Sequence, residues 1–459
     1  MADSANSKNY GVPIYGAGWV PPSTLRSAVE PSADDEKDDG DKSSSSETGN
    51  YVVLAGGGGE GNSGIRNALI VAQFDFDSNV LSDEPVARLG TGSDLPYRMA
   101  VHPGGEGLIC SLPKSCRWFD WDFQTTENRS LGLRSSEKVL EPLEDVGQQL
   151  ALTFNNEGSL LAVGGEDGKL TVFKWPSMEN ILDQANAHTS VKDLDFSPDG
   201  KFLASVGSGP CRIWDVSKST SVASLTKEND EIFGYCRFAP INYENQVLYI
   251  TTMRDQGGSI SKWSTTTWRR IKSKHVVRDP ICAFNISPNG KLLAMLANGQ
   301  DLINRTGFTG TGPRYRILLP EPVLPEISNG SVRSLSYRIG TGLDRTGTAC
   351  IIGHALKATK SQEGTIEGDV LVVSSNNLQV QNVVKKAHLG LVTTLKFSED
   401  SRALLSASLD SRVRVTIIKE EKKSGLSLWI VILALLIAIA VYYAASNGIL
   451  PLELNSILK

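Results

Sequence analysis

FSPDGKFLASVGSGPCRIWDV, residues 196–216, is the stretch of sequence that decides the fold. A Ser-Pro-Asp-Gly turn at 197–200 precedes the apolar run FLASVG, and the run CRIWDV follows after a Ser-Gly-Pro linker. Turn residues between short runs that are rich in β-branched and aromatic side chains predict antiparallel strands. The stretch is therefore expected to form two neighbouring strands, the second ending at Trp214-Asp215.

The same kind of turn recurs along the chain, and its spacing indicates the architecture. The residues that lead into successive turns are 53, 42, 42, 48 and 111 positions apart. A period of about 42 to 48 residues with Trp-Asp at a strand end is typical of WD-type propeller blades, which stack around an axis to bury their faces. The turns lie at 101–105, 154–158, 196–200, 238–240, 286–290 and 397–401.

These turns give six blades, and residues 51–89 supply the strands of a seventh. We therefore expect an all-β, seven-bladed WD-type propeller over residues 50–418. Residues 1–21 are expected to add an N-terminal strand, for which the alternating segment 11–20 is the candidate. A ring closes best when one blade combines strands from both ends of the chain.

The last interval, of 111 residues, is longer than the others, and the additional residues lie at 297–360. Alternation, turns and Trp are missing there, and a strand pattern resumes at 364–373. A long excursion without secondary structure is unusual inside a compact fold. It is interpreted as a surface loop or as translated non-coding sequence such as a retained intron. The second is favoured, because the surrounding blade closes when the segment is deleted.

Residues 22–49 are expected to form a disordered acidic loop. Positions 30–49 hold eight carboxylates, two lysines and four consecutive serines, a composition that cannot build a packed core. The loop is a solvated spacer in the simpler interpretation and a phosphorylatable regulatory segment in the other.

The C-terminal region contains an apolar segment, LSLWIVILALLIAIAVYYAA at 426–445, twenty residues without a charge. That length suffices to cross the hydrocarbon core of a bilayer as a helix. Lysines precede the segment, and Trp429, Tyr442 and Tyr443 lie near its ends. This pattern predicts a single transmembrane helix with the propeller in the cytosol and a short lumenal tail at 446–459. The N-terminus lacks the apolar core of a secretory signal.

Composition excludes several functions. A net charge of −5 without clustered Lys and Arg argues against nucleic-acid binding. The six cysteines show no C-x-x-C pair, and most are expected to be buried as small apolar residues. His188 and His388 precede strand starts, where structural hydrogen bonding is expected.

GGGGEGNSGIRN, residues 56–67, stands out inside an otherwise plain scaffold, with six glycines within nine residues. Ordering so many glycines has a high entropic cost, which indicates a bound ligand. The Gly-x-Gly-x-x-Gly spacing fits a dinucleotide fingerprint, but that fingerprint requires a helix next, whereas 67–74 is expected to be a strand. Carbonyl oxygens of the loop can instead surround a potassium or calcium ion, leaving Ile65 and Asn67 projecting on the far side. An unliganded flexible hairpin is the alternative.

The order Tyr-Gly-Ala (15–17), Leu-Ala-Gly-Gly-Gly-Gly-Glu-Gly-Asn (54–62) and Gly-Ile-x-Asn (64–67) resembles the Sec-twelve family. The stretches 92–98 and 145–149 resemble its plant branch. Members are propellers anchored in the endoplasmic reticulum membrane. They are guanine-nucleotide exchange factors for the small GTPase Sar, which starts COPII coat assembly in transport from the endoplasmic reticulum to the Golgi.

The resemblance implies site residues by position. The loop would bind potassium through Gly58, Gly59, Gly61 and Asn62. Ile65 would act as an apolar wedge and Asn67 as a polar contact with Sar in its GDP-bound and nucleotide-free forms. This chain has Arg66 where other members have Pro.

Such an exchange factor is not an enzyme in the covalent sense, so no acid/base pair or triad is expected. Two other functions are compatible with the sequence. One is an escort of cargo out of the endoplasmic reticulum, and the other is a membrane-tethered WD-repeat scaffold. Neither explains the glycine-rich loop.

Overall fold

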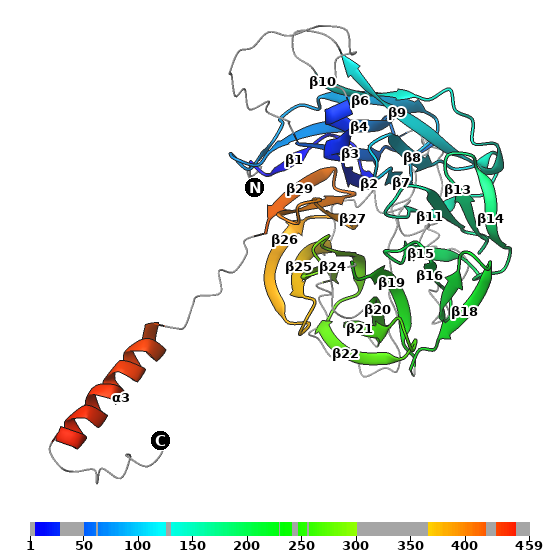
Figure 1. Cartoon of the computed structure of the whole chain (residues 1–459). Helices are drawn as coiled ribbons and strands as arrows, with labels where there is room; N and C mark the ends of the chain where they lie inside the picture. Colours follow the sequence, from blue (N-terminus) through cyan, green and yellow to red (C-terminus); the bar gives the residue numbers. More distant parts are fainter. Residues whose placement is uncertain are drawn as a thin grey trace, which may run out of the picture. The chain divides into compact units, whose positions relative to one another are not determined.

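Short alternating runs separated by tight turns build seven antiparallel sheets, the blades of a propeller (Figure 1). The structure is a computed structural model that describes residues 5–27, 50–60, 63–124, 130–228, 230–240, 247–254, 257–300, 366–418 and 428–446. The chain divides into two units, Met1–Ile417 and Ile418–Lys459. The prediction of an all-β, seven-bladed WD-type propeller is confirmed for the first unit.

The strands follow one another blade by blade. Blade 1 contains β2 (Ile14–Trp19), β3 (Asn50–Gly56), β4 (Asn67–Asp75), β5 (Val80–Leu81) and β6 (Ala87–Gly92). Blade 2 contains β7 (Arg98–Val101), β8 (Gly107–Ser111), β9 (Cys116–Gln124) and β10 (Ser130–Ser135). Blade 3 contains β11 (Gln149–Phe154), β12 (Leu160–Gly165), β13 (Leu170–Lys174) and β14 (Glu179–Gln184). Blade 4 contains β15 (Val191–Phe196), β16 (Phe202–Gly207), β17 (Cys211–Asp215) and β18 (Thr220–Leu225).

The remaining elements complete the ring and the second unit. Blade 5 contains β19 (Ile232–Phe238), β20 (Val247–Arg254), β21 (Gly257–Ser264) and β22 (Arg270–Val277). Blade 6 contains β23 (Ile281–Ile286), β24 (Leu292–Gln300), β25 (Ile366–Ser374) and β26 (Val380–His388). Blade 7 contains β27 (Val392–Phe397), β28 (Ala403–Ser408), β29 (Arg412–Ile417) and β1 (Ser7–Asn9). The helices are α1 (Pro22–Ser27), the 3₁₀ turn η1 (Glu141–Leu143) and α3 (Leu428–Ser446).

The innermost strands β2, β7, β11, β15, β19, β23 and β27 each contact the next one around the axis, and β27 returns to β2. The ring is closed by β1, which pairs with β29 through Ser7↔Arg414 and Asn9↔Arg412. The alternating segment at 11–20 does contain a strand, but β2 is the innermost strand of blade 1. The strand that joins the two chain ends is thus Ser7–Asn9, which is too short to show an alternating pattern in the sequence.

A buried hydrogen-bond network holds blade 4 together and confirms the structural role expected for its histidine. His188 Nε2 lies 2.8 Å from Ser205 Oγ, which also accepts a hydrogen bond from Trp214 Nε1 at 2.8 Å. Burial lowers the pKa of His188 to about 4, so the ring is neutral at pH 7. His388 makes the same contact with Ser406 in blade 7, at 2.8 Å.

The cysteines behave largely as expected from their apolar neighbourhoods. Cys110, Cys116, Cys211 and Cys236 are buried free thiols, and Cys282 is half-buried. Cys350 lies outside the described residues.

The interrupted blade is regular up to both edges of the break. β24 and β25 pair without a bulge from Leu292↔Ser374 to Gln300↔Ile366. Residues 297–300, which the sequence assigned to the break, therefore belong to β24. Residues 301–365, with the rest of the predicted insert, lie outside the described residues.

The expected acidic loop and the predicted transmembrane segment are each described in part. Residues 22–27 of the expected acidic loop form α1, and 28–49 lie outside the described residues. A helix, α3, occupies most of the predicted transmembrane segment. A search of the described residues finds no helix that is long and apolar enough to span a membrane. The predicted lumenal tail beyond Ser446 lies outside the described residues.

Candidate functional site

The glycine-rich loop connects β3 to β4 on one face of the propeller. Neighbouring strands are antiparallel, so the second strand of each blade ends on the face where the chain enters the innermost strand. We call this the entry face. Of the loop, residues 57–60 and 63–66 are described, whereas the predicted potassium ligands Gly61 and Asn62 lie outside the described residues. The loop is followed by strand β4, which argues against a dinucleotide fingerprint.

The described part of the loop uses its glycines for close approach and for left-handed backbone. Gly59 and Gly64 have φ values of 76° and 73°, a region that side chains disfavour. At Gly57, a Cβ atom would lie 2.2 Å from Asn67 Oδ1. The loop therefore folds back against the first residue of β4.

Asn67 holds this arrangement in place. Its Oδ1 accepts a hydrogen bond from the Gly59 N–H at 2.9 Å. Its Nδ2 donates to the carbonyl oxygens of Ser93 at 2.9 Å and Gly92 at 3.1 Å. The side chain is 3% exposed, so the expectation that it projects from the loop is wrong. Its hydrogen bonds tie the loop to the chain that enters blade 2.

Ile65 is half-buried and packs against the core between blades 1 and 7. Its N–H donates to Ser63 Oγ at 3.3 Å, while the neighbouring Gly64 and Arg66 are exposed. Ile65 thus anchors the returning limb of the loop and keeps part of its surface accessible on the entry face.

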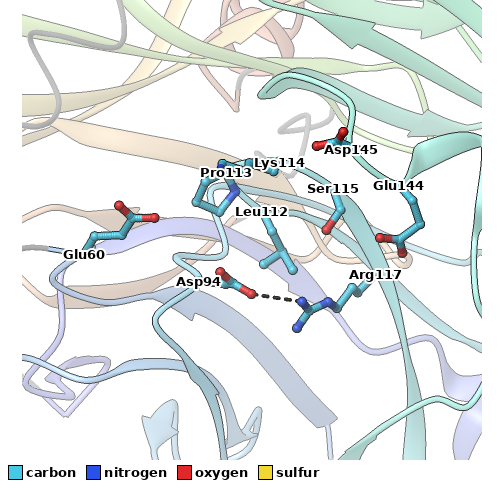
Figure 2. Close-up of a pocket in the computed structure, with 9 residues that line it drawn as sticks. All are labelled: Glu60, Asp94, Leu112, Pro113, Lys114, Ser115, Arg117, Glu144 and Asp145. Atoms are coloured by element: carbon cyan, nitrogen blue, oxygen red, sulfur yellow. Dashed lines mark ion pairs between the residues drawn. The ribbon is translucent and has the colours of Figure 1, made fainter.

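A polar groove of about 330 Å³ lies beside the loop (Figure 2). Glu60 of the loop forms one side, and the β8–β9 turn and the segment before β11 form the others. Asp94 and Arg117 make an ion pair of 3.0 Å in the groove. Its lining residues are Glu60, Asp94, Leu112, Pro113, Lys114, Ser115, Arg117, Glu144 and Asp145.

Apart from Glu60, which belongs to the loop, sequence reasoning did not assign these groove residues to the site, although a signal was present. Asp94 and Asp145 belong to the stretches 92–98 and 145–149, whose resemblance to a known family was visible. Ser93, in the first of these stretches, receives a hydrogen bond from Asn67. The stretches are far apart in sequence, and the tertiary structure brings both next to the loop.

Two of the predicted potassium ligands, Gly58 and Gly59, lie within the described residues. The Gly58 carbonyl accepts a hydrogen bond from Ser63 Oγ and the Gly59 carbonyl one from Asn67 Nδ2, both at 3.4 Å. Such long contacts leave lone pairs for a cation, and neutral oxygens suit a weakly polarising ion. The two described carbonyls are thus compatible with a potassium ion, which stays a prediction because Gly61 and Asn62 lie outside the described residues. Among the described residues, no three His, Cys, Asp or Glu side chains gather as a metal site.

A second charged cluster, at the innermost strands, has a structural role. Asp193 on β15 accepts a hydrogen bond from the Cys236 N–H at 2.9 Å and pairs with Arg237 at 2.5 Å. Asp195 accepts from the Phe238 N–H at 2.6 Å. Burial raises the pKa of Asp195 to about 7. The two carboxylates thus satisfy the free edge of β19 and join blades 4 and 5.

Comparison with known proteins defines the family. Residues 152–253 match a family model for the "Anaphase-promoting complex subunit 4 WD40 domain", and 379–416 match "WD domain, G-beta repeat". SEC12-like protein 2 of Arabidopsis thaliana is 46% identical over 428 residues, covering 93% of this chain and 91% of that protein. The chain belongs to the SEC12-like (Sec-twelve) family of WD-repeat proteins.

Other SEC12 relatives are more distant. SEC12-like protein 1 of Arabidopsis thaliana is 31% identical over 52% of this chain and 60% of its own length. The "Guanine nucleotide-exchange factor SEC12" of Mus musculus is 23% identical over 37% of this chain and 44% of its own length. Exchange activity is thus named for a relative that matches less than half of either chain.

Proposed function

We propose that this chain is a guanine-nucleotide exchange factor for a Sar-type small GTPase, acting at the endoplasmic reticulum in COPII coat assembly. Family membership supports the proposal, as does a mouse relative whose name states exchange activity. The observation that carries it is the loop at 56–67. Asn67 fixes its base, while Glu60, Gly64 and Arg66 remain exposed beside a polar groove.

Such a loop suits exchange because this activity needs no covalent chemistry. An exchange factor binds the nucleotide-free GTPase more tightly than the GDP-bound form, and the difference in affinity sets how far it shifts the equilibrium. A loop with a fixed base can hold the partner's phosphate-binding segments in a displaced position at small entropic cost. GDP then loses contacts and dissociates faster.

Potassium is the second part of the proposal. The carbonyl oxygens of Gly58 and Gly59 would hold the ion together with Gly61 and Asn62, and the ion would restrict the exposed part of the loop. The rate of nucleotide exchange in potassium buffer should then exceed the rate in choline buffer of equal ionic strength. Equal rates would argue against the ion.

Membrane attachment is the third part. It is supported by the charge-free segment at 426–445 and by the exposed apolar side chains of α3, such as Leu433 and Leu436. To test it, the full chain is floated with phosphatidylcholine vesicles and then extracted with carbonate. An inserted chain should stay with the vesicles. A chain that carbonate extracts is not inserted.

The activity itself is tested by GDP release from a Sar-type GTPase. The full chain should accelerate release, and Ile65→Ala should reduce the acceleration about ten-fold, because central apolar contacts dominate interfaces. Ile181→Ala is a matched control, since Ile181 is a half-buried isoleucine on the outer strand β14.

Release that is equal with and without the chain would eliminate the exchange function and leave a cargo escort or a scaffold. Equal losses for Ile65→Ala and Ile181→Ala would eliminate the role of the loop, because the two substitutions remove the same atoms from different parts of the propeller.

A further inference from the structure

The outer strands of blades 5 and 6 form a basic edge of the propeller. β22 and β26 lie on the outside of neighbouring blades (Figure 1). Their sequences, RIKSKHVV and VQNVVKKAH, contain no Asp or Glu. Lys272, Lys385 and Lys386 are exposed, and Lys274 is half-buried. The outer strand of blade 3, in contrast, carries Glu179 and Asp183.

The basic edge includes a pair of like charges on neighbouring strands. Lys262 on β21 is the direct cross-strand partner of Lys272 on β22. Directly opposite side chains lie on the same face of a sheet, so like charges there are destabilising. Burial, and then the charge of Lys272, lowers the pKa of Lys262. Lys262 Nζ lies 5.6 Å from the centroid of the Tyr249 ring, a cation–π contact that offsets part of this cost. No acidic residue of β21 or β22 neutralises the pair.

Apolar side chains are exposed on the same two strands. Ile271 is 57% exposed, and Val380 and Val383 are each 40% exposed. Lysines on edge strands also prevent strands of different molecules from pairing. That role explains single lysines on β22 and β26. It explains neither the Lys262–Lys272 pair nor the exposed Ile271 and valines, which would promote pairing.

We propose that the basic edge, defined as Lys262, Lys272, Lys274, Lys385 and Lys386 with Ile271, Val380 and Val383, binds the headgroups of anionic lipids. Lysines attract a negatively charged membrane surface, and apolar side chains next to them enter the boundary between headgroups and acyl chains. The edge thereby orients the propeller at a membrane.

Other anionic partners fit the edge less well. Nucleic-acid surfaces that use unpaired bases rely on several aromatic side chains for stacking. β22 and β26 contain no Phe, Tyr or Trp, and of their two histidines only His275 is exposed. An acidic protein would form ion pairs with the lysines but leave the exposed aliphatic side chains without a partner of matching chemistry.

The full chain in vesicles provides the test, with lysine acetylation read by mass spectrometry. Lys272 and Lys385 should be labelled about three-fold more slowly with phosphatidylserine-containing vesicles than with phosphatidylcholine vesicles, and high salt should remove the difference. Lys114 on the entry face and Lys201 on the opposite face are exposed internal controls, and their labelling should not change. Equal labelling of Lys272 in both vesicles, or equal protection of the controls, overturns the proposal.

A charge-reversed variant completes the test. In Lys272→Glu/Lys274→Glu/Lys385→Glu, Lys386 should be labelled equally with both kinds of vesicle. Reversal of Lys114, Lys169 and Lys201 should leave the protection of Lys272 intact, and a loss there overturns the proposal. The inference does not depend on insertion of α3. Flotation with neutral vesicles reports insertion, whereas the difference in lysine labelling between the two kinds of vesicle reports binding by the basic edge.

Discussion

Replacement of Asn67 by Ala should release the glycine-rich loop while the propeller stays folded. The substitution removes three hydrogen bonds of 2.9 to 3.1 Å, with the Gly59 N–H and with the carbonyls of Gly92 and Ser93. It also removes the weaker contact of 3.4 Å with the Gly59 carbonyl. Each bond contributes about 1 kcal/mol net, so the loop loses about 3 kcal/mol of local stability. Asn67 is 3% exposed, so water cannot easily replace the lost partner groups.

Hydrogen exchange measured by mass spectrometry on peptides that cover the loop checks this prediction. A loss of about 3 kcal/mol corresponds to roughly a hundred-fold faster exchange of the Gly59 amide. Asn377→Ala is the matched control, because Asn377 is exposed and bonds within its own turn. Unchanged exchange at Gly59 would refute the role assigned to Asn67.

Asn67→Asp separates the acceptor from the donors. The carboxylate still accepts from the Gly59 N–H, but it faces the carbonyl oxygens of Gly92 and Ser93 with no hydrogen to donate. The Gly59 amide should therefore exchange faster than in the wild type, because loss of the two donor bonds and repulsion between the oxygens loosen the loop. Protection near the wild-type level would show that the donor bonds contribute nothing.

The remaining predictions concern the scaffold. His188 has a pKa lowered to about 4 in the folded chain, against about 6.5 when unfolded. Its contribution, at most about 3 kcal/mol, is therefore full above pH 6.5 and is lost as the pH falls towards 4. Urea unfolding should show His188→Gln to be less stable than wild type at pH 7, with a smaller loss of stability on acidification; parallel pH curves would contradict this. Replacing residues 301–365 by a short turn should keep the melting temperature within a few degrees, because Gln300 and Ile366 already pair in register; failure of this variant to fold would show that the segment supports the blade.

Much of the fold could be predicted from the sequence because blades are local structures. The turn and strand signals of 196–216 lie within one hairpin, and β16 pairs with β17 as expected, with Leu203 opposite Trp214. The break in blade 6 was visible because the pattern resumes where β25 begins. The start of the break was predicted four residues too early, because residues 297–300 carry little alternation but extend β24 through backbone pairing.

The candidate site could be predicted only in part. Composition located the loop at 56–67, because six glycines in nine residues are unusual in any scaffold. The direction of the Asn67 side chain depends on carbonyl groups of Gly92 and Ser93, which are distant in sequence. The groove and the basic edge likewise combine residues of several strands or blades.

The sequence by itself determined the repeated blades, the position of the glycine-rich loop and the charge-free C-terminal segment, because each depends on residues that are neighbours along the chain. The tertiary structure decided which strand closes the ring, where Asn67 points and which charges share a surface. β1 has three residues and no pattern of its own, and only the free edge of β29 selects it. Contacts of this kind depend on chain segments that meet after the ring has formed.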